Sequence, residues 1–260
     1  MKTGSGQNEL QAALQPAVEE ESAVKTGPQR NDLLALLPQE AKDRIFPQLR
    51  EVELPLGQEV YAAGQEVKYV YFPADSIVSL LYVMLDGHSA EISVVGCEGI
   101  VGIAVFMGGE STPSRAVVQS AGKAYRLPAT ELKRQFNNDA TFRVLMLRYT
   151  QALITQMAQT AVCNRHHTID QQLCRWLLLS LDRLPTNQLT MTQELIANML
   201  GVRREGVTEA AGKLQKLGAI RYQRGRITVL DRPMVEKLSC ECYSVVREET
   251  DRLAAYAKKL

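Results

Sequence analysis

The chain has 260 residues, 45% of them hydrophobic, and a formal net charge of +1. This length exceeds the usual size of one domain, so we expect two domains, each with its own core. Its longest apolar runs stop well short of the roughly 20 residues that a membrane span needs, and residues 1–30 lack the apolar core of a signal peptide. We therefore expect a cytoplasmic protein with no membrane partner.

The distribution of charge and the cysteine content indicate which kind of partner and which compartment to expect. Residues 168–260 contain 15 lysines and arginines against 11 acidic residues, whereas residues 1–167 contain 15 against 18. The basic end is the natural candidate for contact with a polyanion. Five cysteines, an odd number without repeated spacing, argue against a disulfide scaffold and suit a reducing compartment.

The first half of the chain predicts a tail followed by a β domain. Residues 1–29 are polar and small, so a disordered tail is expected there. Asn31 is a plausible N-cap for short helices, which Pro38 and Pro47 interrupt. Residues 51–127 then carry short β-branched and aromatic runs separated by turn glycines, which is typical of an antiparallel barrel or sandwich. We expect a β-roll domain over residues 30–140, with strands near 67–72, 77–83, 90–95, 115–118 and 124–127.

A long helix is expected next, because residues 141–165 contain no glycine or proline. Its apolar surface is wider than one stripe, so the helix needs two surfaces to pack against. One is the β-roll, and the other is most simply the same helix of a second subunit, packed as in a coiled coil. The alternative is a helix buried wholly inside one core. The expected dimer contacts, within a helix-and-hinge segment 141–167, are Met146, Tyr149, Leu153 and Met157.

Residues 168–240 predict a winged helix-turn-helix domain, followed by a helical extension over residues 241–260. Thr190 or Thr192 can cap a first helix, and Gly201 can end it in the left-handed conformation. A second helix starts near Arg203 and runs to about Leu217, which is the helix-turn-helix arrangement. The segment 219–230 then predicts a β-hairpin with arginines at its tip.

In such a domain the start of the second helix enters the major groove of DNA. Arginine can donate to both acceptors of guanine, and glutamate can accept from cytosine, so Arg204 and Glu205 are the leading base readers. Thr192 and the hairpin arginines are expected to contact phosphates, although a solvated basic hairpin is the alternative. The full set of expected base-reading residues is Arg203, Arg204, Glu205, Thr208 and Glu209, and the expected phosphate contacts are Thr192, Arg224 and Arg226.

The order of these parts over residues 33–238 resembles the bacterial Crp/Fnr family of transcription regulators. The segment "MTQELIANMLGVRREGVTEAAGKLQKLGAI" is similar to the recognition region of that family, with Arg204 and Glu205 at its Arg-Glu pair. Arg203 stands where the family often has serine, Gly206 replaces threonine or serine, and Glu209 falls where many members have arginine. The resemblance implies an α+β protein with a cyclic-nucleotide-binding-like β-roll, a long dimerisation helix and a winged helix-turn-helix.

The resemblance also implies an effector pocket in the β-roll. "EGIVGIAVF" is similar to the phosphate-binding cassette of the family, but it has no glutamate for a ribose hydroxyl. In the segment Ser114-Arg115-Ala116, the arginine stands one position later than the arginine of the family's Arg-Ser/Thr-Ala run. A shift of one residue along a strand turns a side chain to the opposite face, so Arg115 should point away from a cyclic phosphate. We therefore expect no cAMP binding and an unknown small-molecule effector. The expected pocket residues are Gly99, Val101, Gly102, Ile103, Ser114 and Arg115.

No cofactor or metal is expected. The oxygen-sensing branch of the family carries cluster-binding cysteines near its N-terminus, whereas the first cysteine here is Cys97. Cys163, His166 and His167 lie near one helical face, with Asp170 beyond them, and could hold a metal, but their spacing matches no established zinc pattern. Polar hinge residues are the favoured interpretation, and the pattern Cys240-x-Cys242 is likewise a weak signal.

The sequence therefore predicts a homodimeric transcription regulator that binds a palindromic site in double-stranded DNA, with RNA polymerase as a further partner. A nucleotide-sensing scaffold without DNA function is the alternative, but it would keep an intact cassette and a neutral C-terminal domain. An enzyme is not expected, because the chain has no nucleophile elbow, P-loop or paired catalytic carboxylate motif.

Overall fold

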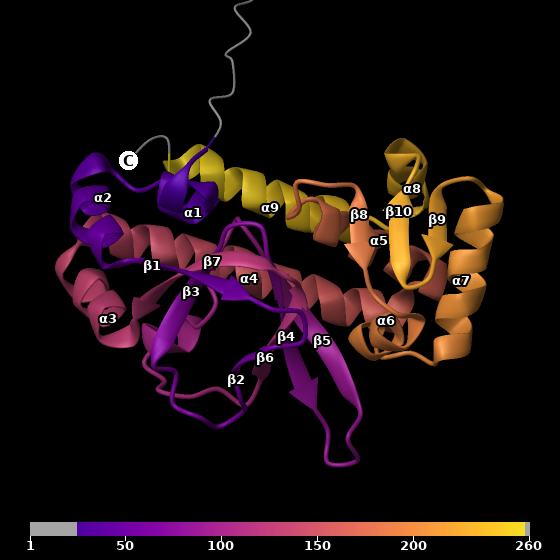
Figure 1. Cartoon of the computed structure of the whole chain (residues 1–260), viewed down its shortest axis with the longest axis horizontal. Helices are drawn as coiled ribbons and strands as arrows, with labels where there is room; N and C mark the ends of the chain where they lie inside the picture. Colours follow the sequence, from indigo (N-terminus) through magenta and orange to yellow (C-terminus); the bar gives the residue numbers. More distant parts are fainter. Residues whose placement is uncertain (1–24, 258–260) are drawn as a thin grey trace, which may run out of the picture.

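The computed structural model describes residues 25–257 (Figure 1). Most of the expected tail, residues 1–24, lies outside the described residues, as do residues 258–260. The described chain begins with short helical elements, and Asn31 caps α1 by accepting a hydrogen bond from the Leu34 N–H at 3.0 Å, as expected. These elements are η1 (Gly27–Arg30), α1 (Asp32–Ala35), α2 (Gln39–Ile45) and η2 (Phe46–Gln48).

The expected β-roll is confirmed as two facing antiparallel sheets. One sheet has the strand order β1-β7-β3, and the other has the order β2-β6-β4-β5. The sequence did not predict β1 and β2, which are short and largely exposed at their starts. The strands are β1 (Arg50–Leu54), β2 (Glu59–Tyr61), β3 (Tyr69–Pro73), β4 (Ile77–Val83), β5 (Ser89–Val95), β6 (Arg115–Ser120) and β7 (Gly122–Pro128), with η3 (Ile103–Val105) between β5 and β6.

Helix α3 (Ala129–Asn138) leads into the long helix α4 (Ala140–His166), which runs along the β-roll and on to the second domain (Figure 1). Asp139 caps α4 by accepting a hydrogen bond from the Phe142 N–H at 2.9 Å. Helix α4 ends at His167, and Thr168 begins α5 (Ile169–Leu181) with a capping box that includes Gln171. The hinge expected near residue 167 is therefore a short joint, His167 and Thr168, between the end of α4 and the start of α5.

The second domain is a winged helix-turn-helix, as predicted. The wing is a three-stranded antiparallel sheet in the order β8-β10-β9, of which the sequence predicted only the last two strands. Its elements are β8 (Gln188–Thr190), α6 (Gln193–Leu200), α7 (Arg204–Lys216), β9 (Ile220–Gln223), β10 (Arg226–Val229) and α8 (Arg232–Leu238).

Helix α9 (Cys242–Ala257) follows and lies along α4 (Figure 1). It reaches both hydrophobic cores, because Leu253 belongs to the core of the β-roll while Tyr243 and Val246 belong to that of the second domain. Ile77 and Leu81 of β4 also pack into the second core. The two domains therefore share a buried interface, and α9 spans it.

Among residues 25–257, no helix combines the length and the hydrophobicity that a bilayer span requires.

Candidate nucleic-acid interface

Local sequence signals position the first helix of the motif. Thr192 is the N-cap of α6, and its hydroxyl accepts a hydrogen bond from the Leu195 N–H at 3.2 Å. Gly201 ends the helix with φ +65° and ψ +35°, a conformation that side-chain-bearing residues reach with strain. Both residues act as the sequence predicted, and together they fix the corner between α6 and α7.

The start of α7 presents charged side chains to solvent. Arg203 is the N-cap residue, Arg204 and Glu205 occupy the first turn, and all three are exposed. Neither arginine forms an ion pair with any residue in the described part of the chain. Because the first backbone N–H groups of a helix also lack helical partners, this end of α7 can contact an anionic groove with both backbone and side chains.

One turn further along α7, the exposed side chains of Thr208 and Glu209 already form hydrogen bonds or ion pairs within the domain. Thr208 donates to the side chain of Gln193 at 2.7 Å or to the carbonyl of Arg204 at 3.0 Å. Glu209 forms an ion pair with Lys213 at 3.1 Å. To contact a base, Thr208 would have to give up its hydrogen bond within the domain, and Glu209 would have to give up its ion pair with Lys213.

Gly206 has a packing role that the sequence did not reveal. A Cβ atom built on it would lie 2.6 Å from Cδ1 of Ile169 in α5. A threonine or serine at this position would need a displacement of α5 or of the Ile169 side chain. The glycine therefore lets α7 approach α5 closely near the joint with α4.

The tip of the wing is a tight turn formed by Arg224 and Gly225. Both have positive φ, +50° and +75°, the combination found in the two-residue turns that match the twist of a hairpin. A groove of about 490 Å³ lies between this turn and the motif, and Thr192, Arg204 and Arg224 are among its lining residues. The expected phosphate-contacting Thr192 and Arg224 therefore share one groove with the expected base reader Arg204.

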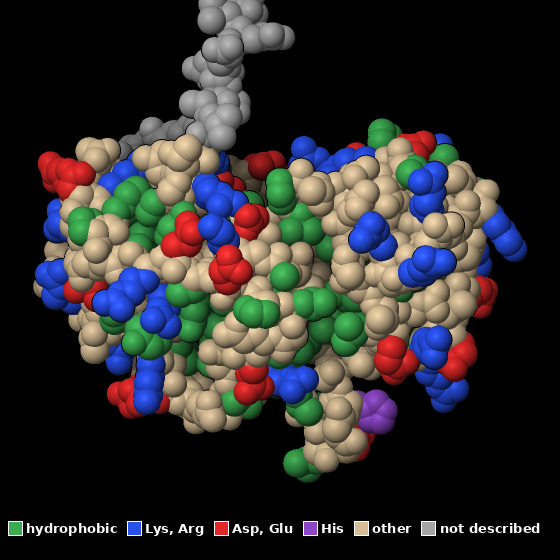
Figure 2. All heavy atoms as spheres, viewed as in Figure 1, with side chains coloured by type: hydrophobic (Ala, Val, Ile, Leu, Met, Phe, Trp, Pro, Cys, Tyr) green, Lys and Arg blue, Asp and Glu red, His purple; other side chains and the backbone are tan. Residues whose placement is uncertain are grey.

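A second polar groove, of about 880 Å³, runs along the wing and is lined by Arg221, Arg224 and Arg226. In this groove too, the described residues provide no ion-pair partner for the three arginines. Figure 2 shows lysine and arginine side chains spread over the part of the molecule that carries α7 and the wing. The excess positive charge of residues 168–260 thus includes the arginines that line these two grooves.

The expected effector loop is packed against other parts of the protein. A Cβ atom on Gly99 would lie 2.3 Å from the Tyr149 hydroxyl of α4, and one on Gly102, which has φ +106°, would lie 3.0 Å from Val70. Val101 forms an isolated antiparallel bridge with Tyr71. Ile103 packs against the core. This loop is therefore in contact with the long helix and is lined mainly by apolar groups.

Strand β6 alternates between the inside and the outside of the roll. Ala116 and Val118 belong to the core of the roll, whereas Val117 packs against the core of the second domain. Arg115 precedes Ala116 and by strand alternation lies on the outer face with Val117. Ser114 is buried, and its hydroxyl lies 3.0 Å from that of Thr112.

Each of the two domains matches the model of a known protein family. Residues 51–139 match the model of the cyclic nucleotide-binding domain, and residues 171–238 match that of the Crp-like helix-turn-helix domain. The chain belongs to the Crp/Fnr family of transcription regulators. No curated protein matches the sequence.

Solved structures of Crp/Fnr proteins share this fold at low sequence identity. FixK2 from Bradyrhizobium japonicum is 16% identical with a TM-score of 0.62, and the alignment covers 74% of this chain and 98% of that one. A putative Crp/Fnr transcriptional regulator from Eubacterium rectale is 18% identical with a TM-score of 0.63, covering 81% and 98%. The c-di-GMP responsive regulator CLP from Xanthomonas campestris is 15% identical with a TM-score of 0.58, covering 74% and 99%.

In this Crp/Fnr protein, the domain interface contains buried charge. Arg183 at the end of α5 donates from Nε to Glu98 at 2.7 Å, and Glu98 also accepts from the Gly96 N–H at 3.1 Å. Burial raises the pKa of Glu91, which faces Arg175 of α5, to about 7. The buried charged side chains of residues 25–257 are Glu91, Arg175 and Arg183, and none lies inside the roll.

The face of α4 that packs against the β-roll includes residues that were expected to contact a second subunit. Met146, Tyr149 and Leu153 are at most 3% exposed and belong to the core of the roll, and Met157 packs against that core. Three of the expected dimer contacts, Met146, Tyr149 and Leu153, are therefore already covered within one chain, whereas Met157 is only partly buried. The exposed face of α4 instead carries Leu147, Gln151, Ile154, Ala158, Ala161 and Arg165.

The expectation for the cysteines and histidines is also revised. The structure brings Cys163 and His167 together with Cys240 and Cys242. His166 is exposed and outside this group, and the Asp170 carboxylate pairs with Lys213 at 3.1 Å. Two sequence signals that were each too weak to assign thus belong to one cluster.

Proposed function

We propose that this protein binds a palindromic site in double-stranded DNA as a homodimer and regulates transcription in the cytoplasm together with RNA polymerase. The observation that carries the proposal is the exposed, unpaired pair Arg203 and Arg204 at the start of α7, beside the arginine-lined grooves of the wing. This arrangement supplies base-edge donors at the helix start and phosphate contacts on the wing beside it.

The proposed dimer seam is the exposed face of α4. From Leu147 to Arg165, its residues are spaced alternately four and three apart, which is the a/d pattern of a coiled coil. Leu147 and Ile154 are 45% and 49% exposed, which is high for large apolar side chains on a long helix. Packing this face against the same face of a second subunit would cover it and would place two α7 helices about a two-fold axis.

We also propose that the roll responds to a ligand other than cAMP. Cyclic phosphate needs a positive partner inside the pocket, and a ribose hydroxyl needs an acceptor. Arg115 alternates with inward-facing Ala116, and Ile103 occupies the place expected for the acceptor. Because the Gly99 loop touches Tyr149, a ligand that displaces this loop would act directly on the long helix.

Replacing Arg204 by alanine should weaken binding to the cognate site by about 1 to 3 kcal/mol and relax discrimination at one position of each half-site. The cognate site is first obtained by selecting bound duplexes from a randomised pool. Titrations on cognate and scrambled duplexes then measure the effect. Arg226→Ala is the matched control, and it should weaken both duplexes equally and flatten the salt dependence. Equal losses on both duplexes for Arg204→Ala would contradict the base-reading role.

Calorimetric titration with cAMP should give binding at least about a hundredfold weaker than micromolar, because two unmatched polar groups cost about 1 to 3 kcal/mol each. The same weakness is expected for cGMP. Arg115→Ala is the informative variant, since the outward position of this residue predicts no further change. Micromolar cAMP binding that is lost in Arg115→Ala would show that the arginine faces the pocket.

A further inference from the structure

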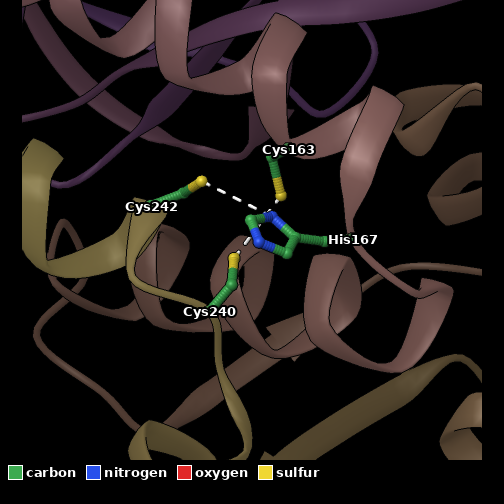
Figure 3. Close-up of side chains that lie close together, drawn as sticks. All are labelled: Cys163, His167, Cys240 and Cys242. Atoms are coloured by element: carbon green, nitrogen blue, oxygen red, sulfur yellow. Dashed lines mark hydrogen bonds between the residues drawn. The ribbon is translucent and has the colours of Figure 1, made fainter.

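Four potential metal ligands converge where the two domains meet. Cys163 and His167 lie one turn apart at the end of α4, whereas Cys240 and Cys242 flank the start of α9 (Figure 3). The four ligand atoms all lie within 4.8 Å of one another. Three of the residues are buried, and the imidazole of His167 is 14% exposed.

The spacing of these atoms fits a single tetrahedral ion. The sulfurs of Cys163 and Cys240 are 3.5 Å apart, and the sulfur of Cys242 is 3.6 Å from Nδ1 of His167. Bonds of about 2.3 Å to sulfur and 2.0 Å to nitrogen would place two sulfurs about 3.8 Å apart, and a sulfur and a nitrogen about 3.5 Å apart. A cluster of several irons would require its ligand atoms to be farther apart.

The surroundings orient the histidine as a ligand. Its Nδ1 faces the sulfurs, and its Nε2 lies 3.3 Å from the carboxylate of Glu241. An imidazole that binds a metal through one nitrogen commonly donates its other N–H to a carboxylate, which fixes the ring and raises its basicity. Gln172 donates to the backbone carbonyl of His167 at 2.9 Å and so holds the same residue from α5.

We propose that Cys163, His167, Cys240 and Cys242 bind one Zn²⁺ ion. Three thiolates and one imidazole form a closed tetrahedral set of the kind that structural zinc sites use, and soft sulfur ligands disfavour magnesium, calcium and manganese. Three thiolates with Zn²⁺ carry one net negative charge, and the buried guanidinium of Arg175 lies close enough to act on Cys163 and Cys242.

The position of the site gives the ion a structural role. It ties the end of α4 to the start of α9, two segments separated by more than 70 residues, at the joint from which α5 begins. Helix α9 then returns along α4 to the core of the roll. The bound ion therefore fastens the C-terminal helix and fixes the joint between the sensor and the DNA-binding domain.

Metal analysis of the full-length protein, purified under reducing conditions and reconstituted with ZnCl₂, tests the proposal without reference to DNA. About one zinc per chain is expected, and each of Cys163→Ala, His167→Ala, Cys240→Ala and Cys242→Ala should lower the content at least about fivefold. Cys174→Ala and His166→Ala are the matched controls, since Cys174 is buried but outside the cluster and His166 is the adjacent histidine. Both controls should keep the full zinc content.

Cobalt substitution in the wild-type protein gives a readout that does not depend on the folding of the variants. Tetrahedral Co²⁺ with three thiolates should show intense visible d–d bands and a near-ultraviolet charge-transfer band, both displaced by zinc. In chelated protein, amide exchange should accelerate at residues 239–246. A wild-type chain that takes up neither metal, a bound iron–sulfur cluster, or a Cys163–Cys240 disulfide in the reduced preparation would overturn the proposal. Unchanged amide exchange would overturn the fastening role.

Discussion

Ile154→Asp is expected to convert the protein from a dimer to a monomer at micromolar concentration. Ile154 is central in the exposed a/d face of α4, so the two-fold axis would bring two aspartates together in an apolar seam. A buried charge without a partner costs several kcal/mol, which corresponds to a loss of at least about a hundredfold in association. Sedimentation equilibrium measures this change directly.

DNA affinity should fall with the dimer, because two recognition helices on one palindromic site bind together. Leu56→Asp is the matched control, since Leu56 is also 49% exposed but lies on the β-roll, away from α4. It should leave both association and DNA binding unchanged. An Ile154→Asp protein that stays dimeric would show that the seam lies elsewhere.

Glu98→Ala is expected to lower the free energy of unfolding by about 3 to 5 kcal/mol, because it leaves Arg183 buried without its charge partner. The two side chains are 15% and 6% exposed, and they join the loop after β5 to the end of α5. The carbonyl of Leu179 also accepts from Arg183, which holds the guanidinium in place when the carboxylate is removed.

Urea unfolding followed by circular dichroism measures the change. Glu209→Ala is the control, because its ion pair with Lys213 is largely exposed, and loss of this pair should leave the unfolding midpoint unchanged. A midpoint for Glu98→Ala equal to that of the control would show that Arg183 finds another partner, and that the pair does not hold the two domains together.

The DNA-binding motif was readable from the sequence because its signals are local. Thr192, Gly201 and the arginines of the wing act through caps, turns and charge within a few residues of their own position. The same reasoning found the β-roll and the cap at Asn31. It missed β1 and β2, since short edge segments carry little hydrophobic periodicity.

The hydrophobic periodicity of α4 is not sufficient to predict which partner each of its faces contacts. The sequence establishes that this helix has apolar side chains on more than one face, so that it needs two packing surfaces. It does not establish which face the β-roll covers. Only the packing of Phe142, Met146 and Tyr149 into the roll decides this, and it leaves Leu147 and Ile154 exposed.

By itself, the sequence determined the order of the domains, the helix-turn-helix, the basic wing and the unusual cassette, because each is specified by neighbouring residues. The ligand cluster at the joint was decided by tertiary structure alone. Cys163 and His167 become neighbours of Cys240 and Cys242 only because α9 packs back along α4. Neither pair has the spacing of a complete site, and contacts between distant segments depend on the packing of whole helices, which local patterns do not encode.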